Sequence, residues 1–241
     1  MTKPTLLAVS HGTADQRGQA VVRRLVEIMR GRLTQIEVVQ AFVDVEEPSL
    51  PDVLARLDGP VTVVPLLLGA GFHVHVDITH AVRQRAASGA PTATAATLGP
   101  DAGLTGVLVE RLQHVELSER DAVVLAVAGS SDIRARLGAD RAAALLSARL
   151  RRRVRVGHLG GSGRPLEWAI AEARSGLPAG GRVVAANYLL APGYFNDRLN
   201  ESSADVVTGP LAAGVRLDHR LVDLVLRRYE GASQRRFAQA G

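Results

Sequence analysis

The 241-residue sequence contains no cysteine. This absence excludes disulfide bonds, iron–sulfur clusters held by thiolates and catalysis by a thiol, and it is typical of proteins in a reducing cytoplasm. No apolar run approaches the ~18 residues of a membrane-spanning helix. Residues 1–5 run into a strand without the basic region and long apolar segment of a signal peptide. We therefore expect a cytoplasmic protein that has no membrane partner.

Aromatic residues are also scarce, at 3% of a chain whose hydrophobic content is 46%. The cores must therefore consist mainly of Val, Leu and Ala. The scarcity leaves few rings on which nucleic-acid bases could stack, and no nucleic-acid-binding motif is recognisable. The net charge of +5 alone keeps a nucleic-acid binder open as an alternative, but we expect no nucleic-acid partner.

Short apolar runs alternate along the chain with segments of helical periodicity. In the first half the apolar runs cover residues 5–10, 36–42, 61–68 and 92–97; in the second they cover 122–128, 154–159 and 182–190, with a fourth ending at 208. This alternation predicts an α/β protein with two tandem domains, 1–117 and 118–241, each a four-stranded parallel sheet flanked by helices. The polar, small-residue-rich segment after Tyr229 is expected to be poorly ordered.

Three similarities in the same order indicate that the second half duplicates the first. The stretch 10–13 is matched with 129–132, the stretch 67–73 with 189–195, and Leu98-Gly99-Pro100 with Thr208-Gly209-Pro210. At offsets of 118 and 122 residues, Gly129 stands where the first half has His11, and Phe195 stands where it has His73. The scaffold is repeated, but the two histidines belong to the first half only.

His11, Asp44 and His73 each follow a different predicted strand of the first half. The carboxyl ends of parallel strands meet at one edge of a sheet, where ligands bind in open α/β folds. Imidazole nitrogen binds divalent first-row metals, a carboxylate can complete such a site, and two histidines with one acid leave positions open for exchange. A lone histidine at a strand end is more often a helix cap or a satisfied polar residue. Three such groups at three strand ends favour a shared functional site.

Two further residues near His73 are less decisive. His75 would lie about 200° around an α-helix that starts near His73, facing away from it. Asp77 is four residues after His73, where it could orient the imidazole ring or simply be a first-turn acid favoured by the helix dipole. Both readings of Asp77 stay open.

With these motifs the sequence resembles a known family, the class II chelatases of the sirohydrochlorin type (the CbiX and SirB group). The resemblance is carried by Ser10-His11-Gly12, Phe42-x-Asp44-x-x-x-Pro48-Ser49 and Pro65-Leu66-x-Leu68-x-x-Gly71-x-His73-Val74-x-x-Asp77-Ile78. It covers nearly the whole chain, because the long members of the family are two fused chelatase-like halves. The family often has Glu where this chain has Asp44, so whether Asp44 ligates the metal directly is open.

The resemblance implies insertion of Fe²⁺ or Co²⁺ into sirohydrochlorin, on the path to sirohaem or cobalamin, without ATP. It implies no cofactor beyond the metal ion that is the substrate. The two metal ligands of the family fall on His11 and His73, which with Asp44 are the expected catalytic residues. Ser10 and Gly71, in the same motifs, are expected to contact the tetrapyrrole substrate.

The charge of the two halves suggests a division of labour between them. Residues 1–117 carry 10 Lys and Arg against 12 Asp and Glu, a net of −2, whereas residues 118–241 carry 19 against 12, a net of +7. The second half is therefore expected to form a wall of the pocket for the anionic macrocycle, with Asn196 and Arg198 as contacts. Because a fused pair can supply internally what a half-length chain gains by dimerising, we expect a monomer with pseudo-two-fold halves.

Two other functions use the same residues. A non-catalytic carrier of metal or tetrapyrrole could bind through His11 and His73 without turnover. A protoporphyrin ferrochelatase shares the broad fold, but it meets a hydrophobic macrocycle, and the scarcity of aromatic residues argues against it.

Overall fold

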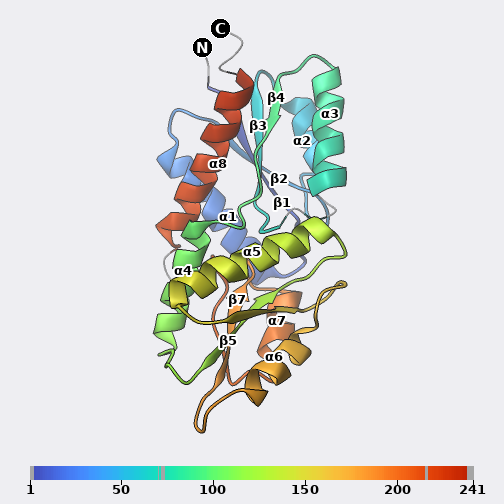
Figure 1. Cartoon of the computed structure of the whole chain (residues 1–241). Coiled ribbons are helices and arrows are strands. Elements are labelled where there is room, and N and C mark those ends of the chain that lie inside the picture. Colours follow the sequence, from blue (N-terminus) through green and yellow to red (C-terminus); the bar gives the residue numbers. More distant parts are fainter. Residues whose placement is uncertain (1–2, 70, 72–73, 215–216, 238–241) are drawn as a thin grey trace. The chain divides into compact units, whose positions relative to one another are not determined.

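The computed structural model describes residues 3–69, 71, 74–214 and 217–237, without the side chains of residues 74 and 75. It contains two parallel four-stranded sheets (Figure 1). The first has the order β2-β1-β3-β4 and the second the order β6-β5-β7-β8. This confirms the predicted α/β class with two four-stranded parallel sheets. Among the described residues, no helix is both long enough and apolar enough to cross a bilayer.

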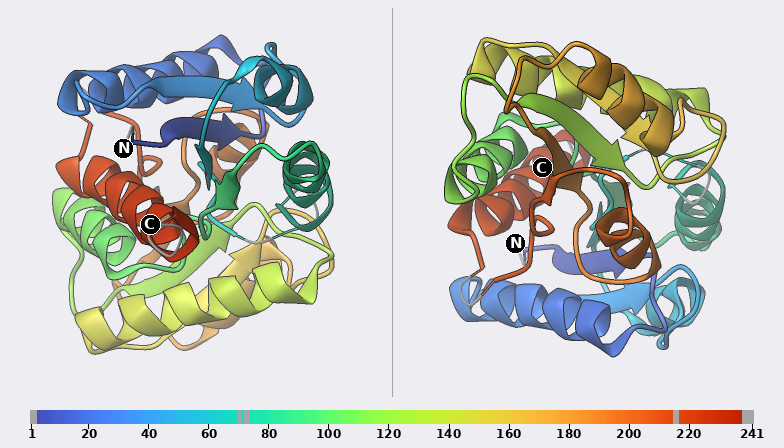
Figure 2. Two further views of the ribbon diagram at one scale, coloured as in Figure 1. Left: turned by 90° about the horizontal axis from the view of Figure 1, so that it is seen from above. Right: turned by 90° about the horizontal axis from the view of Figure 1, so that it is seen from below.

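The first sheet is made by β1 (Thr5–Ser10), β2 (Val38–Phe42), β3 (Val61–Pro65) and β4 (Thr92–Thr94). All six residues of β1 are buried, because helices cover both faces of the sheet. Figures 1 and 2 show α1 (Gln16–Arg32) and α8 (His219–Phe237) on one face, and α2 (Leu50–Arg56) and α3 (Thr79–Ala87) on the other. Successive side chains of β1 point to opposite faces of the sheet, so Leu7 and Val9 share one face and Leu6 and Ala8 the other. Leu7 and Val9 belong to the core under α2 and α3.

The second sheet repeats this arrangement with β5 (Ala122–Val127), β6 (Val154–His158), β7 (Val183–Tyr188) and β8 (Val206–Val207). Its helices are α4 (Ala102–His114), α5 (Ile133–Leu150), α6 (Leu166–Ser175) and α7 (Tyr194–Asn200). The core between α6 and the sheet contains Val124, Ala126 and Ile170, all fully buried. As the composition predicts, these cores are made chiefly of Val, Leu and Ala.

The compact units of the chain do not coincide with the two sequence halves. One unit combines residues 1–98 with 221–241, and the other contains 99–220. Helix α4 contacts α5 and β7 of the second unit. In the first unit, Arg228 of α8 donates from Nε to the Thr97 carbonyl oxygen at 2.9 Å. The predicted boundary at 117/118 separates the two sheets, and as a domain boundary it stays a prediction.

The expectation of disorder after Tyr229 is wrong for the residues described there, because α8 continues to Phe237. The Tyr229 hydroxyl donates to the Pro4 carbonyl oxygen at 2.6 Å, and Ala232 is buried. The Ser233 hydroxyl lies 2.8 Å from the Thr62 hydroxyl in β3. Small residues that look like a polar tail in the sequence are here the residues that let a helix approach the sheet closely.

The backbone geometry supports the duplication but corrects its register. Asp15 caps α1 by accepting from the Arg17 amide, and Asp132 caps α5 in the same way from the Arg134 amide. Gly12 and Gly129, each three residues before the cap, have φ of 95° and 96°. Gly12 is therefore the equivalent of Gly129, so the predicted match of His11 with Gly129 is wrong by one residue.

The third similarity was also misaligned. The Leu98 amide donates to the Leu67 carbonyl oxygen at 2.9 Å, and the Leu211 amide donates to the Leu189 carbonyl oxygen at 2.8 Å. Because Leu67 and Leu189 are equivalent, Leu98 corresponds to Leu211 and not to Thr208. The Leu-Gly-Pro and Thr-Gly-Pro similarity in the sequence is therefore coincidental.

A buried arginine in α3, which the sequence does not single out, organises the loops at the amino edge of the first sheet. Arg85 is 6% exposed, and burial lowers the pKa of its guanidinium while the charge of Asp58 raises it. The guanidinium makes five hydrogen bonds, to the carbonyl oxygens of Leu54, Leu57, Gly59 and Pro91 and to the Thr92 hydroxyl. Its planar fork reaches acceptors in separate loops at once.

We expect Arg85→Lys to lower the free energy of unfolding by about 2 kcal/mol, because an ammonium group keeps the charge but leaves several buried carbonyl oxygens without a donor. The measurement is urea unfolding followed by far-UV circular dichroism. Arg83→Lys, at an exposed position of the same helix, is the control and should change stability by less than about 0.5 kcal/mol. Equal midpoints for the two variants would contradict the role given to Arg85.

Candidate functional site

The carboxyl edge of the first sheet brings His11 and Asp44 together. Parallel pairing of β1 and β2 continues beyond the strands: the Val43 amide donates to the Ser10 carbonyl oxygen at 3.0 Å, and the Asp44 amide donates to the His11 carbonyl oxygen at 2.9 Å. His11 is half-buried and Asp44 is exposed. The backbones of two of the three predicted site residues are thus joined by a hydrogen bond.

Gly12 makes this close approach possible. Its φ of 95° lies in a region that residues with a Cβ rarely adopt. A Cβ built there would lie 2.0 Å from the Asp44 carbonyl oxygen, far inside van der Waals contact. The glycine of the Ser10-His11-Gly12 motif therefore allows the loop after β1 to pass directly against the loop after β2.

The loop after β2 contains a strained turn between two acids. The Glu46 amide donates to the Asp44 carbonyl oxygen at 2.7 Å, which closes a γ-turn around Val45. Val45 has φ of 65° and is 58% exposed. A β-branched residue at positive φ is an outlier, and such strain persists where surrounding contacts impose it. Here Asp44 helps to impose it, because its Oδ1 accepts from the Val45 amide at 2.8 Å.

Glu46 connects two loops of the candidate site and was not singled out in the sequence. Its Oε1 accepts from the Thr13 amide at 2.9 Å, so it ties the loop carrying His11 to the loop carrying Asp44. The Gln19 side chain in α1 adds a bond from Nε2 to the Thr13 carbonyl oxygen at 2.8 Å. The signal that could have found Glu46 is the spacing in Val43-Asp44-Val45-Glu46, which places two acids two residues apart after a strand.

Asp15, which is close to His11 in the sequence, has a structural role at the start of α1. It caps α1, and the hydrogen bond from the Arg17 guanidinium lowers the pKa of its carboxyl to about 2. The Asp15 amide donates to the Thr13 hydroxyl at 3.1 Å. Because Asp15 is ionised and paired at neutral pH, it is a poor acceptor for a proton released in the site.

The third arm of the predicted site follows β3. The Leu66 amide donates to the Val9 carbonyl oxygen at 2.7 Å, so pairing with β1 continues past Pro65. Gly71 is half-buried, and His73 lies outside the described residues. Residues Val74–Ile78 form a π-helix before α3. The predicted angle between His73 and His75, which assumed an α-helix, therefore does not apply. Short π-helical turns are frequent at functional sites.

Ser10 and the possible metal ligands are the remaining features of this edge of the sheet. Ser10 is 5% exposed, and its Oγ has no hydrogen-bond partner among the residues that the structure describes. Within that same part of the chain, no three His, Asp or Glu side chains are grouped to hold a metal ion. The predicted set needs His73, so this finding leaves it untested.

Residues 5–115 match the model of the CbiX family. This span contains the loops after β1, β2 and β3 and thus all three predicted site residues. The first half of the chain is therefore similar to the CbiX family. No curated protein matches the sequence significantly.

Solved structures show the same fold over both halves. SirB from Bacillus subtilis with Fe³⁺ has a TM-score of 0.81 at 18% identity, with 98% of each chain covered. SirB from Bacillus subtilis subspecies spizizenii, described as a sirohydrochlorin chelatase in complex with cobalt, has a TM-score of 0.76 at 18% identity and the same coverage. A CbiX described as the terminal enzyme of sirohaem biosynthesis in denitrifying bacteria has a TM-score of 0.61 at 20% identity, covering 92% of this chain and 98% of its own.

The half that matches the CbiX model differs from the second half at each site position. With the corrected register, Ala128 stands at the position of His11. Gly160 stands at the position of Asp44, since a Cβ on Gly129 would lie 1.9 Å from the Gly160 carbonyl oxygen just as Gly12 faces Asp44. Phe195 remains the counterpart of His73 in the sequence. The second half thus keeps the loop geometry and has neither the histidines nor the acid.

Asn196 and Arg198, the predicted substrate contacts in the second half, have different surroundings. Asn196 is 8% exposed, and its Oδ1 accepts from the Asn187 side chain at 2.9 Å, which favours a structural role. Arg198 is exposed, donates from Nη1 to the Leu159 carbonyl oxygen at 2.9 Å, and places its guanidinium 5.8 Å from the Tyr194 ring centroid. Of the two, only Arg198 presents a charge to solvent.

Proposed function

We propose that this protein is a sirohydrochlorin chelatase, which inserts a divalent metal ion, Fe²⁺ or Co²⁺, into sirohydrochlorin. The observation that carries the proposal is the CbiX-family match over 5–115, the span that contains His11, Asp44 and His73. The loss of all three in a copy that keeps the glycine turn supports it further. A scaffold that retains its fold while losing these residues does not need them for folding.

The proposed chemistry follows from the metal and the macrocycle. A divalent ion replaces two pyrrole N–H protons, so each turnover binds one metal ion and releases two protons. His11 and His73 would hold the partly dehydrated ion as neutral imidazoles, which are good ligands for both metals. Asp44, exposed beside His11, or one of the histidines would take up a proton from the macrocycle.

Glu46 would act on this site without touching the metal. Its carboxylate holds the Thr13 amide, and the γ-turn at Val45 fixes the spacing between Asp44 and Glu46. Ligands that must receive and then release an ion work best on a scaffold that does not rearrange with each exchange. Arg198 remains a proposed contact for the carboxylates of the substrate, and the contact through Asn196 stays a prediction.

The choice of metal and pathway belongs to the proposal as well. Two histidines and a carboxylate accommodate both Fe²⁺ and Co²⁺, and relative affinity does not select the physiological ion. We favour iron, and therefore sirohaem rather than cobalamin, in the cytoplasm. Initial rates with each metal under anaerobic conditions would decide between them.

The test is turnover. Metal-free sirohydrochlorin mixed anaerobically with Fe²⁺ or Co²⁺ and substoichiometric protein should lose its free-base absorption spectrum much faster than without protein. The rival function, a non-catalytic carrier, predicts at most one spectral change per protein molecule. A rate equal to the protein-free rate, together with tight stoichiometric binding of metal or tetrapyrrole, would replace the chelatase proposal with the carrier.

A further inference from the structure

A pocket at the amino end of β5, within the second unit, has a volume of about 570 Å³. It is lined by residues 119–122, 150–153 and 176–178. We call it the arginine pocket. Its volume falls in the range of small-molecule sites. It lies at the amino edge of its sheet, whereas the candidate metal site lies at the carboxyl edge of the other sheet, so its role is independent of the proposed function.

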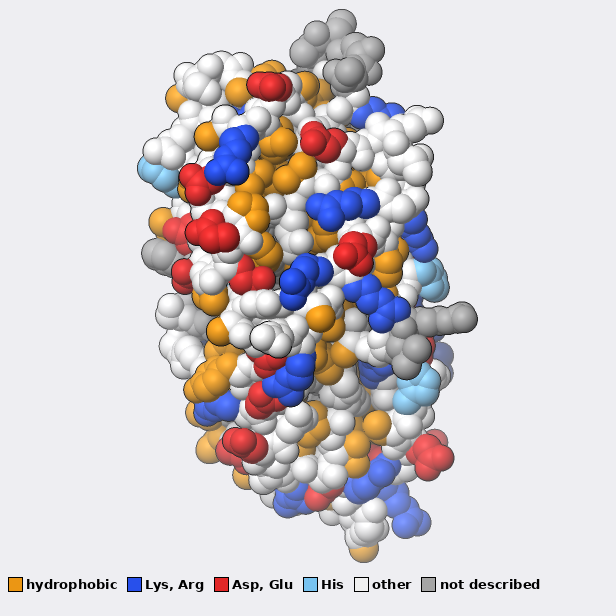
Figure 3. Space-filling view, turned by 180° about the vertical axis from the view of Figure 1, so that it is seen from behind, with side chains coloured by type: hydrophobic (Ala, Val, Ile, Leu, Met, Phe, Trp, Pro, Cys, Tyr) orange, Lys and Arg blue, Asp and Glu red, His pale blue; other side chains and the backbone are white. Residues whose placement is uncertain are grey.

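Positive charge dominates the lining. The lining contains four arginines and two acids: Arg120, Arg151, Arg152 and Arg153, with Glu119 and Asp121. Arg120 and Arg151 are exposed, and neither has a carboxylate partner among the residues that the structure describes. Over the face drawn in Figure 3, Lys and Arg side chains lie among Asp and Glu. The arginine pocket is thus a local concentration of positive charge.

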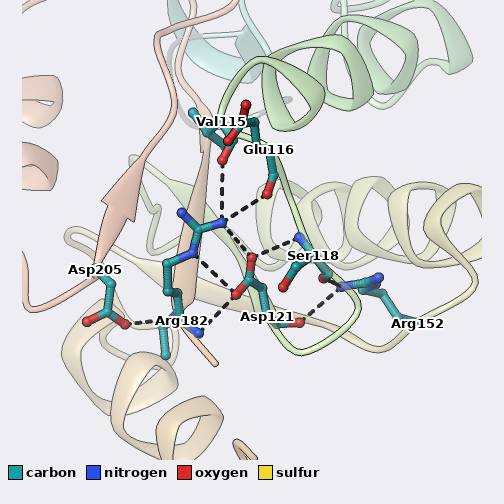
Figure 4. Close-up of polar contacts among 8 residues, drawn as sticks. Val115, Glu116, Ser118, Asp121, Arg152, Arg182 and Asp205 are labelled. Atoms are coloured by element: carbon teal, nitrogen blue, oxygen red, sulfur yellow. Dashed lines mark hydrogen bonds and ion pairs between the residues drawn. The ribbon is translucent and has the colours of Figure 1, made fainter. Parts of the chain in front are cut away.

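Asp121 does not cancel this charge, because it is already paired inside the unit (Figure 4). Its side chain is 1% exposed and lies 2.8 Å from Nη2 of Arg182. The amides of Ser118 and Arg182 donate to the same carboxylate at 2.9 and 3.0 Å. Burial raises the pKa of the Asp121 carboxyl, but the hydrogen bonds from Arg182 and the Ser118 amide outweigh it and hold the pKa well below its usual range.

Arg152 is held in place before any ligand arrives. Its Nη1 donates to the carbonyl oxygens of Ser118 and Asp121 at 2.7 and 3.0 Å, as Figure 4 shows. A guanidinium fixed by one nitrogen keeps other donors for a ligand and loses less entropy when it binds. The dipole of α5 favours cations near the end of that helix, but it does not account for Arg120, which comes from the segment before β5.

We propose that the arginine pocket binds a small oligoanion that carries at least two phosphate or carboxylate groups. Guanidinium groups form bidentate, charge-assisted hydrogen bonds with both kinds of anion. Several arginines around one hollow favour a ligand with more than one anionic group. None of the lining residues is aromatic, whereas sites for single-stranded nucleic acid stack bases on aromatic rings. The lining therefore favours a small molecule over a nucleic-acid strand.

The test is isothermal titration calorimetry of the full chain with inorganic pyrophosphate and, separately, with tricarballylate at low ionic strength. We expect saturable binding of at least one probe by the wild-type protein, weakened as salt is raised. The double variant Arg120→Gln/Arg151→Gln should bind about tenfold more weakly. The matched control Arg23→Gln/Arg141→Gln removes the same charge from exposed positions outside the pocket and should bind like the wild type.

The two probes distinguish phosphate ligands from carboxylate ligands. Binding of pyrophosphate alone assigns the pocket to phosphate ligands, and binding of tricarballylate alone assigns it to carboxylate ligands. No saturable binding of either probe, or equal weakening in the pocket and control variants, would overturn the proposal. Because Arg120 and Arg151 are exposed, both variants should fold, and circular dichroism checks this directly.

Discussion

His11→Ala and His73→Ala should each lower the rate of metal insertion by at least about 100-fold. Loss of residues that merely support metal ligands costs 10–100-fold in affinity or activity, so loss of a ligand itself should cost at least as much. His11 lies in a half-buried loop, and its replacement by Ala should change the free energy of unfolding by less than about 1 kcal/mol. The measurements are the spectral assay for turnover and urea unfolding for stability.

His114→Ala is the control, because His114 is an exposed residue at the end of α4, outside the proposed site. It should retain full activity. If both His11→Ala and His73→Ala keep near wild-type turnover, the site assignment fails even if the protein is a chelatase. If wild-type protein shows no turnover but His11→Ala loses stoichiometric metal binding, the residues are right and the function is the carrier.

The parts of the fold that the sequence predicts well are those with strong periodicity. Residues 5–10 and 122–127 are continuous apolar runs, and both are central strands, as expected for a sheet covered on both faces. The edge strands β4 and β8 are shorter than the apolar runs predict, with 3 and 2 residues. An edge strand pairs on one side only, so apolar residues there can be buried by helices without continuing the ladder.

The missed features depend on contacts distant in sequence. Nothing near Arg85 indicates that its guanidinium is the donor for carbonyl oxygens of α2 and of the loops before β3 and β4. Likewise α8 has a polar second half, and its helical structure is explained by Tyr229 reaching Pro4, 225 residues away in the sequence. Local propensity is a weak guide where tertiary contacts decide the outcome.

For the candidate site, the sequence predicts which residues follow which strands, but it does not predict the contacts between their loops. The sequence places His11 and Asp44 after neighbouring strands, and the hydrogen bond from the Asp44 amide to the His11 carbonyl oxygen shows their loops side by side. The γ-turn at Val45 and the bond from Thr13 to Glu46 could not be read from spacing, because both depend on how the two loops meet. The π-helix at Val74–Ile78 changes the periodicity from which the orientation of His75 was inferred.

Gly12→Ala and Gly129→Ala should separate the scaffold from the chemistry, because they introduce the same strain in the two halves. Each glycine has φ near 95°. An added Cβ would lie 2.0 Å from the Asp44 carbonyl oxygen in the first half and 1.9 Å from the Gly160 carbonyl oxygen in the second. Since the obstacle is backbone in both cases, each variant should lose about 3 kcal/mol of unfolding free energy.

Only Gly12→Ala, however, displaces the loop of His11 from that of Asp44. Assayed at a temperature where both variants remain folded, Gly12→Ala should lose at least about tenfold in turnover, because small misplacements of reacting groups are costly. Gly129→Ala should keep most of its activity despite equal destabilisation, since Ala128 and Gly160 carry no catalytic group. Equal activity losses in the two variants would mean that turnover depends on the second loop as much as on the first, and the assignment of the chemistry to one half would then be wrong.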